Sequence, residues 1–210
     1  RRLVREIQNH LKKFKYKHYL FIKMKHTLKV TIILVILFLA AQLIGLTLVN
    51  KSLSKPLPYN IERPEFETGL GFTVQLLFIL FIATIMILFI AKFKFEKLWK
   101  LSFFFAVWFS LVIAFSSFLN QILATVIAFI LAGLKTFYRD VISHNFTELF
   151  IYSGLAIMFV PIKVLNIFWI SVLLILISIY DMIAVWKTKH MIKLAKFQAK
   201  ARVFAGLLIP

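Results

Sequence analysis

Residues 165–186 read LNIFWISVLLILISIYDMIAVW, a run that is almost entirely apolar. It carries a single charged side chain, Asp181. A bilayer core about 30 Å thick requires about 20 predominantly apolar residues in an α-helix, so the stretch is long enough to cross a membrane. In lipid only helices and closed barrels satisfy all their backbone polar groups. An unbroken apolar run of this length therefore predicts a transmembrane helix with an acid inside it.

The rest of the chain is also strongly apolar. It has 210 residues, of which 61% are hydrophobic and 16% charged, and its mean hydropathy is +0.90. A soluble domain has about 45–50% apolar and about 25% charged residues, and one core of this size cannot bury such an excess. We predict an all-α polytopic membrane protein with six transmembrane helices. The predicted spans are about 30–49, 71–91, 98–119, 122–138, 149–162 and 165–186.

The positive charges predict the direction of these spans. With six spans, 22 of the 26 Lys and Arg residues fall on one side of the membrane. Cytoplasmic loops collect Lys and Arg, so segment 1–29 and tail 187–210 are predicted to be cytoplasmic. This distribution also accounts for the net charge of +18 without nucleic acid as a partner. The lipid bilayer is the expected surrounding.

Several chemistries are excluded by composition. The chain has no cysteine and only six scattered glycines, which excludes thiolate metal sites and a glycine-rich phosphate loop. The five histidines lie outside the predicted spans, and no His-Glu-x-x-His pattern is present. We therefore expect no metal and no cofactor. Seven of the eight acids, including Asp140 and Glu148 before the fifth span, fall in predicted loops or the N-terminal segment and are expected to be solvated.

Asp181 is the exception among the acids. It precedes Lys187 by six residues, which places it about 9 Å along the helix from the first following charge. A charged side chain inside a bilayer costs about 2.5–3.5 kcal/mol or more, so such residues are usually functional. An aspartate that merely reaches the interface is the alternative, but Asp is too short to do so easily. A functional acid here would suit proteolysis, proton-coupled transport or ion binding.

Tyr180-Asp181, near the cytoplasmic end of a sixth span, resembles half of a known active site. It is similar to the Tyr-Asp motif of the intramembrane aspartyl proteases, presenilin and signal peptide peptidase. The residues that follow, DMIAVWKTKHMIKLA at 181–195, resemble the corresponding stretch of archaeal presenilin homologues. The resemblance in order and topology covers about residues 25–210, and only the last thirty residues match in detail. The cytoplasmic N-terminus fits the presenilin orientation.

The resemblance implies a nine-span fold with a second catalytic aspartate. In the family this residue belongs to a Gly-x-Gly-Asp motif in the seventh span, and a Pro-Ala-Leu motif lies near the ninth. Neither motif occurs in residues 1–210, and Asp140 has no neighbouring glycines. We therefore expect an incomplete chain, the six-helix N-terminal part, that is inactive alone. Its tail would lead toward a seventh span.

The sequence thus predicts an intramembrane aspartyl protease that hydrolyses peptide bonds of transmembrane-helix substrates. Asp181 would be one of its two catalytic aspartates, and Tyr180 would pack or hydrogen-bond beside it. The alternative is a proton- or ion-coupled transporter or channel that uses Asp181 as its ion site.

Overall fold

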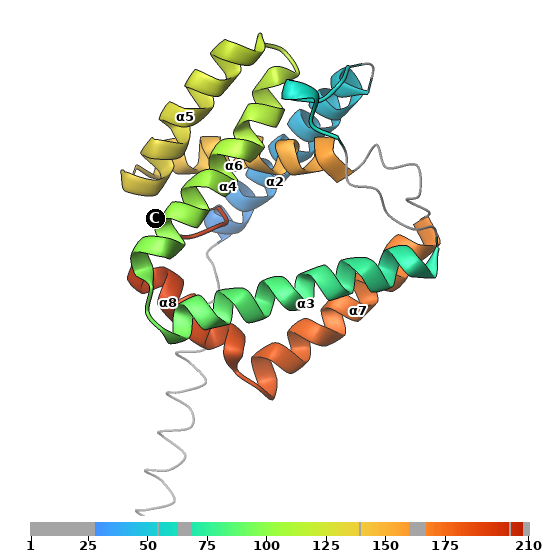
Figure 1. Cartoon of the computed structure of the whole chain (residues 1–210), viewed down its shortest axis with the longest axis vertical. Coiled ribbons are helices and arrows are strands. Elements are labelled where there is room, and N and C mark those ends of the chain that lie inside the picture. Colours follow the sequence, from blue (N-terminus) through green and yellow to red (C-terminus); the bar gives the residue numbers. More distant parts are fainter. Residues whose placement is uncertain are drawn as a thin grey trace, which may run out of the picture. The chain divides into compact units, whose positions relative to one another are not determined.

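The structure, a computed structural model, describes residues 28–53, 55–62, 69–138, 140–159, 167–201 and 203–207. All its regular elements within these residues are helical (Figure 1). They are α2 (Leu28–Ser52), the short 3₁₀-helix η1 (Pro58–Asn60), α3 (Leu70–Lys92), α4 (Glu96–Ser116), α5 (Gln121–Phe137), α6 (Val141–Phe159), α7 (Ile167–Trp186) and α8 (His190–Ala201). The prediction of an all-α fold is confirmed.

Four of these helices, α2, α3, α4 and α7, are long and apolar enough to cross a membrane. Each of the six predicted spans falls on a helix, but α5 is a shorter apolar helix of 17 residues. Helix α6 begins at Val141, before the predicted start at Leu149, and five of its first eight residues are polar. Four spans are therefore supported, whereas six spans and the nine-helix fold stay predictions. Most of segment 1–29 and the connection at 160–166 lie outside the described residues.

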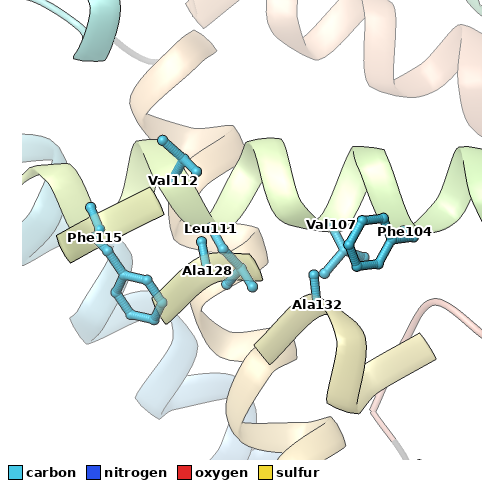
Figure 2. Packing of buried hydrophobic residues seen from close by; sticks show 8 residues of the cluster. Phe104, Val107, Leu111, Val112, Phe115, Ala128 and Ala132 are labelled. Atoms are coloured by element: carbon cyan, nitrogen blue, oxygen red, sulfur yellow. The ribbon is translucent and has the colours of Figure 1, made fainter. Parts of the chain in front are cut away.

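Contacts divide the chain into two compact units, Arg1–Phe38 and Leu39–Leu208. In the second unit, α4 packs against both α5 and α6, and α5 also contacts α6. The α4–α5 contact uses an alanine stripe on α5 with a spacing of four residues: Ala124, Ala128 and Ala132 are fully buried. Figure 2 shows Ala128 and Ala132 on the side of α5 that meets Leu111 and Phe104 of α4. Small side chains let two helix backbones approach closely, which provides packing in lipid where no hydrophobic force acts between helices.

The α4–α6 contact is closer still. Ser110 of α4 donates a hydrogen bond to the Ile151 carbonyl of α6, with a length of 2.9 Å. A Cβ atom added to Gly154 would lie 2.1 Å from the Ser110 carbonyl oxygen. Position 154 therefore admits only glycine at this separation of the helices. The second half of α2 joins the same core, where Leu48 and Val49 pack with Ile113, Ala114 and Ile157.

A second set of contacts surrounds α7. This helix packs against α3, and the two run side by side in Figure 1. Helix α8 contacts α3, α4 and α7 near the end of α7. Most of the apolar surface of α3 and α7 is exposed within the described chain. This surface is suited to contact with lipid or with further transmembrane helices.

Candidate functional site

Helix α7 carries the predicted site residues, Tyr180 and Asp181, close to its C-terminal end at Trp186. Its isoleucines, leucines and valines form a continuous apolar run, so its hydrogen-bonded backbone is compatible with lipid throughout. The helix ends in a cap: the Lys187 and Thr188 amides both donate to the Ile183 carbonyl, at 3.0 and 3.1 Å. The acid therefore lies a little more than one turn before the helix terminus.

Tyr180 is tied to the connection between α7 and α8 through His190. The Tyr180 hydroxyl lies 3.2 Å from Nε2 of His190, and the Thr188 hydroxyl lies 2.6 Å from Nδ1. A neutral imidazole has one donor and one acceptor nitrogen, so one ring satisfies both hydroxyls. Lys189, between these partners, has a φ of 55°, which provides the sharp reversal from α7 into α8. Tyr180 thus fixes the turn that directly follows the candidate acid.

Asp181 is exposed on α7, whereas Ala184, one turn later, is fully buried. Within the part of the chain that the structure describes, the Asp181 carboxylate has no ion-pair or hydrogen-bond partner. Tyr180 and Asp181 are consecutive, so their side chains leave the helix about 100° apart. The tyrosine is half-buried and anchors the helix end, while the acid is free to face another molecule or segment.

The structure corrects the expectation for Glu148. This acid was predicted to be solvated in a connection, but it lies on α6, is 2% exposed and forms an ion pair with Lys135 of α5. The physical reason is the early start of α6. The Asp140 carboxylate accepts a hydrogen bond of 2.7 Å from the Ser143 amide, which is an N-cap interaction that begins the helix at Val141. Glu148 is thereby placed on a helical face toward α5.

His144 extends this ion pair into a buried polar network. The sequence places it outside the clear spans, and in the structure it is 8% exposed on α6, four residues before Glu148. Lys135 Nζ lies 3.4 Å from both ring nitrogens of His144. His144 Nε2 lies 2.9 Å from the Gly206 carbonyl oxygen. A carbonyl only accepts, so Nε2 carries the proton and Nδ1 is left as the acceptor that faces Lys135.

This network holds the segment after α8. Gly206 has a φ of +133°, and a Cβ there would lie 2.8 Å from the Phe204 ring. Only glycine suits this conformation, which turns the Gly206 carbonyl toward His144. The sequence contains one sign of this network. Residues 144 and 148 are four apart, so they share one face if the segment is helical, and Lys135 ends the preceding apolar run. Hydropathy does not show that the helix already begins at Val141, so this sign could not be recognised.

No group of three or more His, Asp or Glu side chains arranged to hold a metal ion is present in the described ranges.

The chain is a helical integral membrane protein that presents an acid on one of its membrane-spanning helices. A family model, described as signal-peptide peptidase, presenilin aspartyl protease, matches residues 30–210. The chain belongs to this family, which confirms the resemblance carried by Tyr180-Asp181. No curated protein and no solved structure matches the chain significantly.

Proposed function

We propose that the protein hydrolyses peptide bonds of transmembrane segments and that Asp181 is one of its two catalytic aspartates. The family supports intramembrane aspartyl proteolysis in general. The observation that carries the residue assignment is the position of Asp181: it is the single acid on α7, exposed and without an ion-pair partner among the described residues. Glu148, the other acid of an apolar region, is neutralised by Lys135 and is unavailable for chemistry.

Peptide hydrolysis by carboxylates needs a pair. Two close carboxyl groups cannot both ionise cheaply, so they share one proton. The ionised member takes a proton from water, which attacks the peptide carbonyl carbon, and the protonated member donates its proton to the carbonyl oxygen, which gives a tetrahedral diol. The carboxyl group that received the water proton then passes it to the amide nitrogen while the other carboxylate takes a proton from a diol hydroxyl, so that the C–N bond breaks and the amine leaves. Glu148 is engaged and Asp140 caps α6, so we propose that neither of them is the second carboxylate. The group that supplies it would lie against the exposed Asp181 face of α7.

The substrate has to be unwound locally before this reaction. Amide groups within a transmembrane helix are hydrogen-bonded and sterically shielded, so a carbonyl becomes accessible only where its helix is opened. Tyr180 is proposed as a positioning residue, because its hydrogen bond to His190 fixes the α7–α8 turn beside Asp181. The proposed hydrolysis takes place within the membrane and needs no cofactor.

The test is cleavage of a transmembrane substrate by the full-length protein in proteoliposomes. Asp181→Asn keeps the shape of the side chain and removes its charge, and we expect cleavage to fall to background. The matched control is Asp140→Asn, which removes an exposed acid but keeps an N-cap residue, so cleavage should persist. Undiminished cleavage by Asp181→Asn overturns the assignment. Ion flux that depends on Asp181 without cleavage supports a transporter instead.

A further inference from the structure

Helix α8 is amphipathic and packs against α4 through one face, while its lysines stay exposed to solvent. Its inner face buries Phe197 and Ala201, which are 8% and 1% exposed. The Phe197 ring packs edge-on against Trp99 of α4, with 6.0 Å between the ring centroids. Lys200 adds an ion pair with Glu96, with an N–O distance of 3.0 Å. These contacts fix the rotation of α8 about its axis.

A stripe of lysines runs along α8 beside its buried face. Lys193, Lys196 and Lys200 lie three and four residues apart, so they share one side of the helix, and all three are exposed. Further exposed lysines flank the helix at the ends of neighbouring elements, among them Lys94, Lys97 and Lys187. We call these six residues the lysine cluster.

Little negative charge balances the lysine cluster from within the chain. Residues 92–100 and 187–201 together contain nine lysines and one acid, Glu96. Glu96 is already paired with Lys200. These two segments therefore present a strong positive potential where α3 ends, α4 begins and α7 turns into α8. Such a surface attracts anions from its surroundings.

The position of the lysine cluster along the apolar helices indicates which class of anion it binds. Helix α8 contacts three helices, α3, α4 and α7, that are long and apolar enough to cross a membrane. Its contacts with α4 lie at the start of that helix, at Glu96 and Trp99. Trp186, at the end of α7, is 73% exposed, and Phe93 and Phe95, beside Lys94, are about half exposed. Tryptophan and other aromatic residues concentrate at the headgroup level of a bilayer. Lysines interleaved with exposed aromatic rings suit the boundary between acyl chains and phosphates better than they suit an acidic peptide.

We propose that the lysine cluster of α8 and its flanking turns binds the phosphate headgroups of anionic phospholipids in the adjoining leaflet. A basic amphipathic helix on its own lies in this interface and binds anionic lipid through its lysines. Here the helix is also locked to α4, so bound headgroups would hold the α7–α8 turn and thereby the end of the helix that carries Asp181. The binding itself does not depend on the proposed proteolysis.

The experiment uses a fluorescent label on α8. The 210 residues contain no cysteine, so Ala199→Cys, an exposed position between the lysines, gives one labelled site in this part of the protein. The labelled full-length protein in neutral detergent is titrated with short-chain phosphatidylglycerol and, separately, with short-chain phosphatidylcholine. We expect a saturable response to phosphatidylglycerol and none to phosphatidylcholine. Equal responses to the two lipids would overturn the proposal.

Charge variants test the residues. Each lysine near a membrane surface contributes about fivefold in affinity, so Lys193→Gln with Lys196→Gln should weaken phosphatidylglycerol binding about 25-fold. The matched control is Lys51→Gln with Lys55→Gln, two exposed lysines outside the cluster, which should leave binding unchanged. Circular dichroism checks that both variants fold. Unchanged affinity in the α8 variant contradicts the proposal, as does a hexaglutamate peptide that binds more tightly than phosphatidylglycerol.

Discussion

Lys135 and Glu148 form an ion pair between α5 and α6 in which the lysine side chain is fully buried and the acid is 2% exposed. Two charges removed from solvent are costly to hold, and their mutual attraction repays this cost only with good geometry and further hydrogen bonds. His144 and its own carbonyl oxygen surround the ammonium group at 3.4 Å and supply part of that support. The pair thus joins two helices and, through His144, the Gly206 segment.

Removing one partner of this pair should destabilise the protein strongly. Glu148→Gln leaves the Lys135 charge buried without a countercharge, which costs about 3–5 kcal/mol. We expect a lower thermal unfolding midpoint in detergent, measured by circular dichroism. The double variant Lys135→Met with Glu148→Leu removes both charges and should recover most of the loss. A midpoint for Glu148→Gln equal to that of the parent protein would show that the ion pair contributes nothing.

The sequence predicted the helices better than it predicted this ion pair. Hydropathy locates apolar runs such as residues 71–91, which agree with α3 within a residue at each end. Residues 141–148 resemble a loop in a hydropathy reading, because five of them are polar and the pattern does not show that His144, Thr147 and Glu148 are buried. Similarly, Tyr180-Asp181 was found as a local motif, whereas the bond from Tyr180 to His190 depends on a reversal of the chain at Lys189.

Because Tyr180 and His190 share a hydrogen bond, the effects of their substitutions on the free energy of unfolding should not be additive. Tyr180→Phe removes this hydrogen bond and should lower stability by about 0.5–1.5 kcal/mol. His190→Ala removes it together with the contact to the Thr188 hydroxyl, so its loss should be larger. The double variant should lose less than the sum of the two single losses, because the shared bond is lost only once. Thermal midpoints of the three variants measure this. Tyr138→Phe, an exposed tyrosine, is the control and should have no effect; strict additivity would argue against the bond.

Asp140 should make the start of α6 sensitive to acid. Hydrogen bonds from the Ser143 backbone lower the pKa of the Asp140 carboxyl below its usual value near 3.8. A carboxyl with a lowered folded-state pKa stabilises the fold above its unfolded pKa, and this contribution is lost as pH falls from about 4 through the folded value. Asp140→Ala should therefore lower the thermal midpoint at pH 6 and differ less from the parent at pH 3. Asp140→Asn still caps the helix and should lose less than Asp140→Ala at pH 6, while its difference from the parent should change with pH in the same way; an equal shift for Asp140→Ala at both pH values contradicts the assignment.

Two glycines should respond in opposite directions to the same substitution. Gly154→Ala places a methyl group 2.1 Å from the Ser110 carbonyl, so α4 and α6 must separate, and overpacking of this kind costs about 1–3 kcal/mol. Gly133→Ala, inside α5, meets nothing within 4 Å and should stabilise that helix by about 0.5–1 kcal/mol through reduced backbone freedom. The thermal midpoint should fall for the first variant and rise for the second. Because both changes add one methyl group to a glycine of an apolar helix, equal shifts would mean that α4 and α6 do not approach as closely as the Ser110–Ile151 hydrogen bond requires.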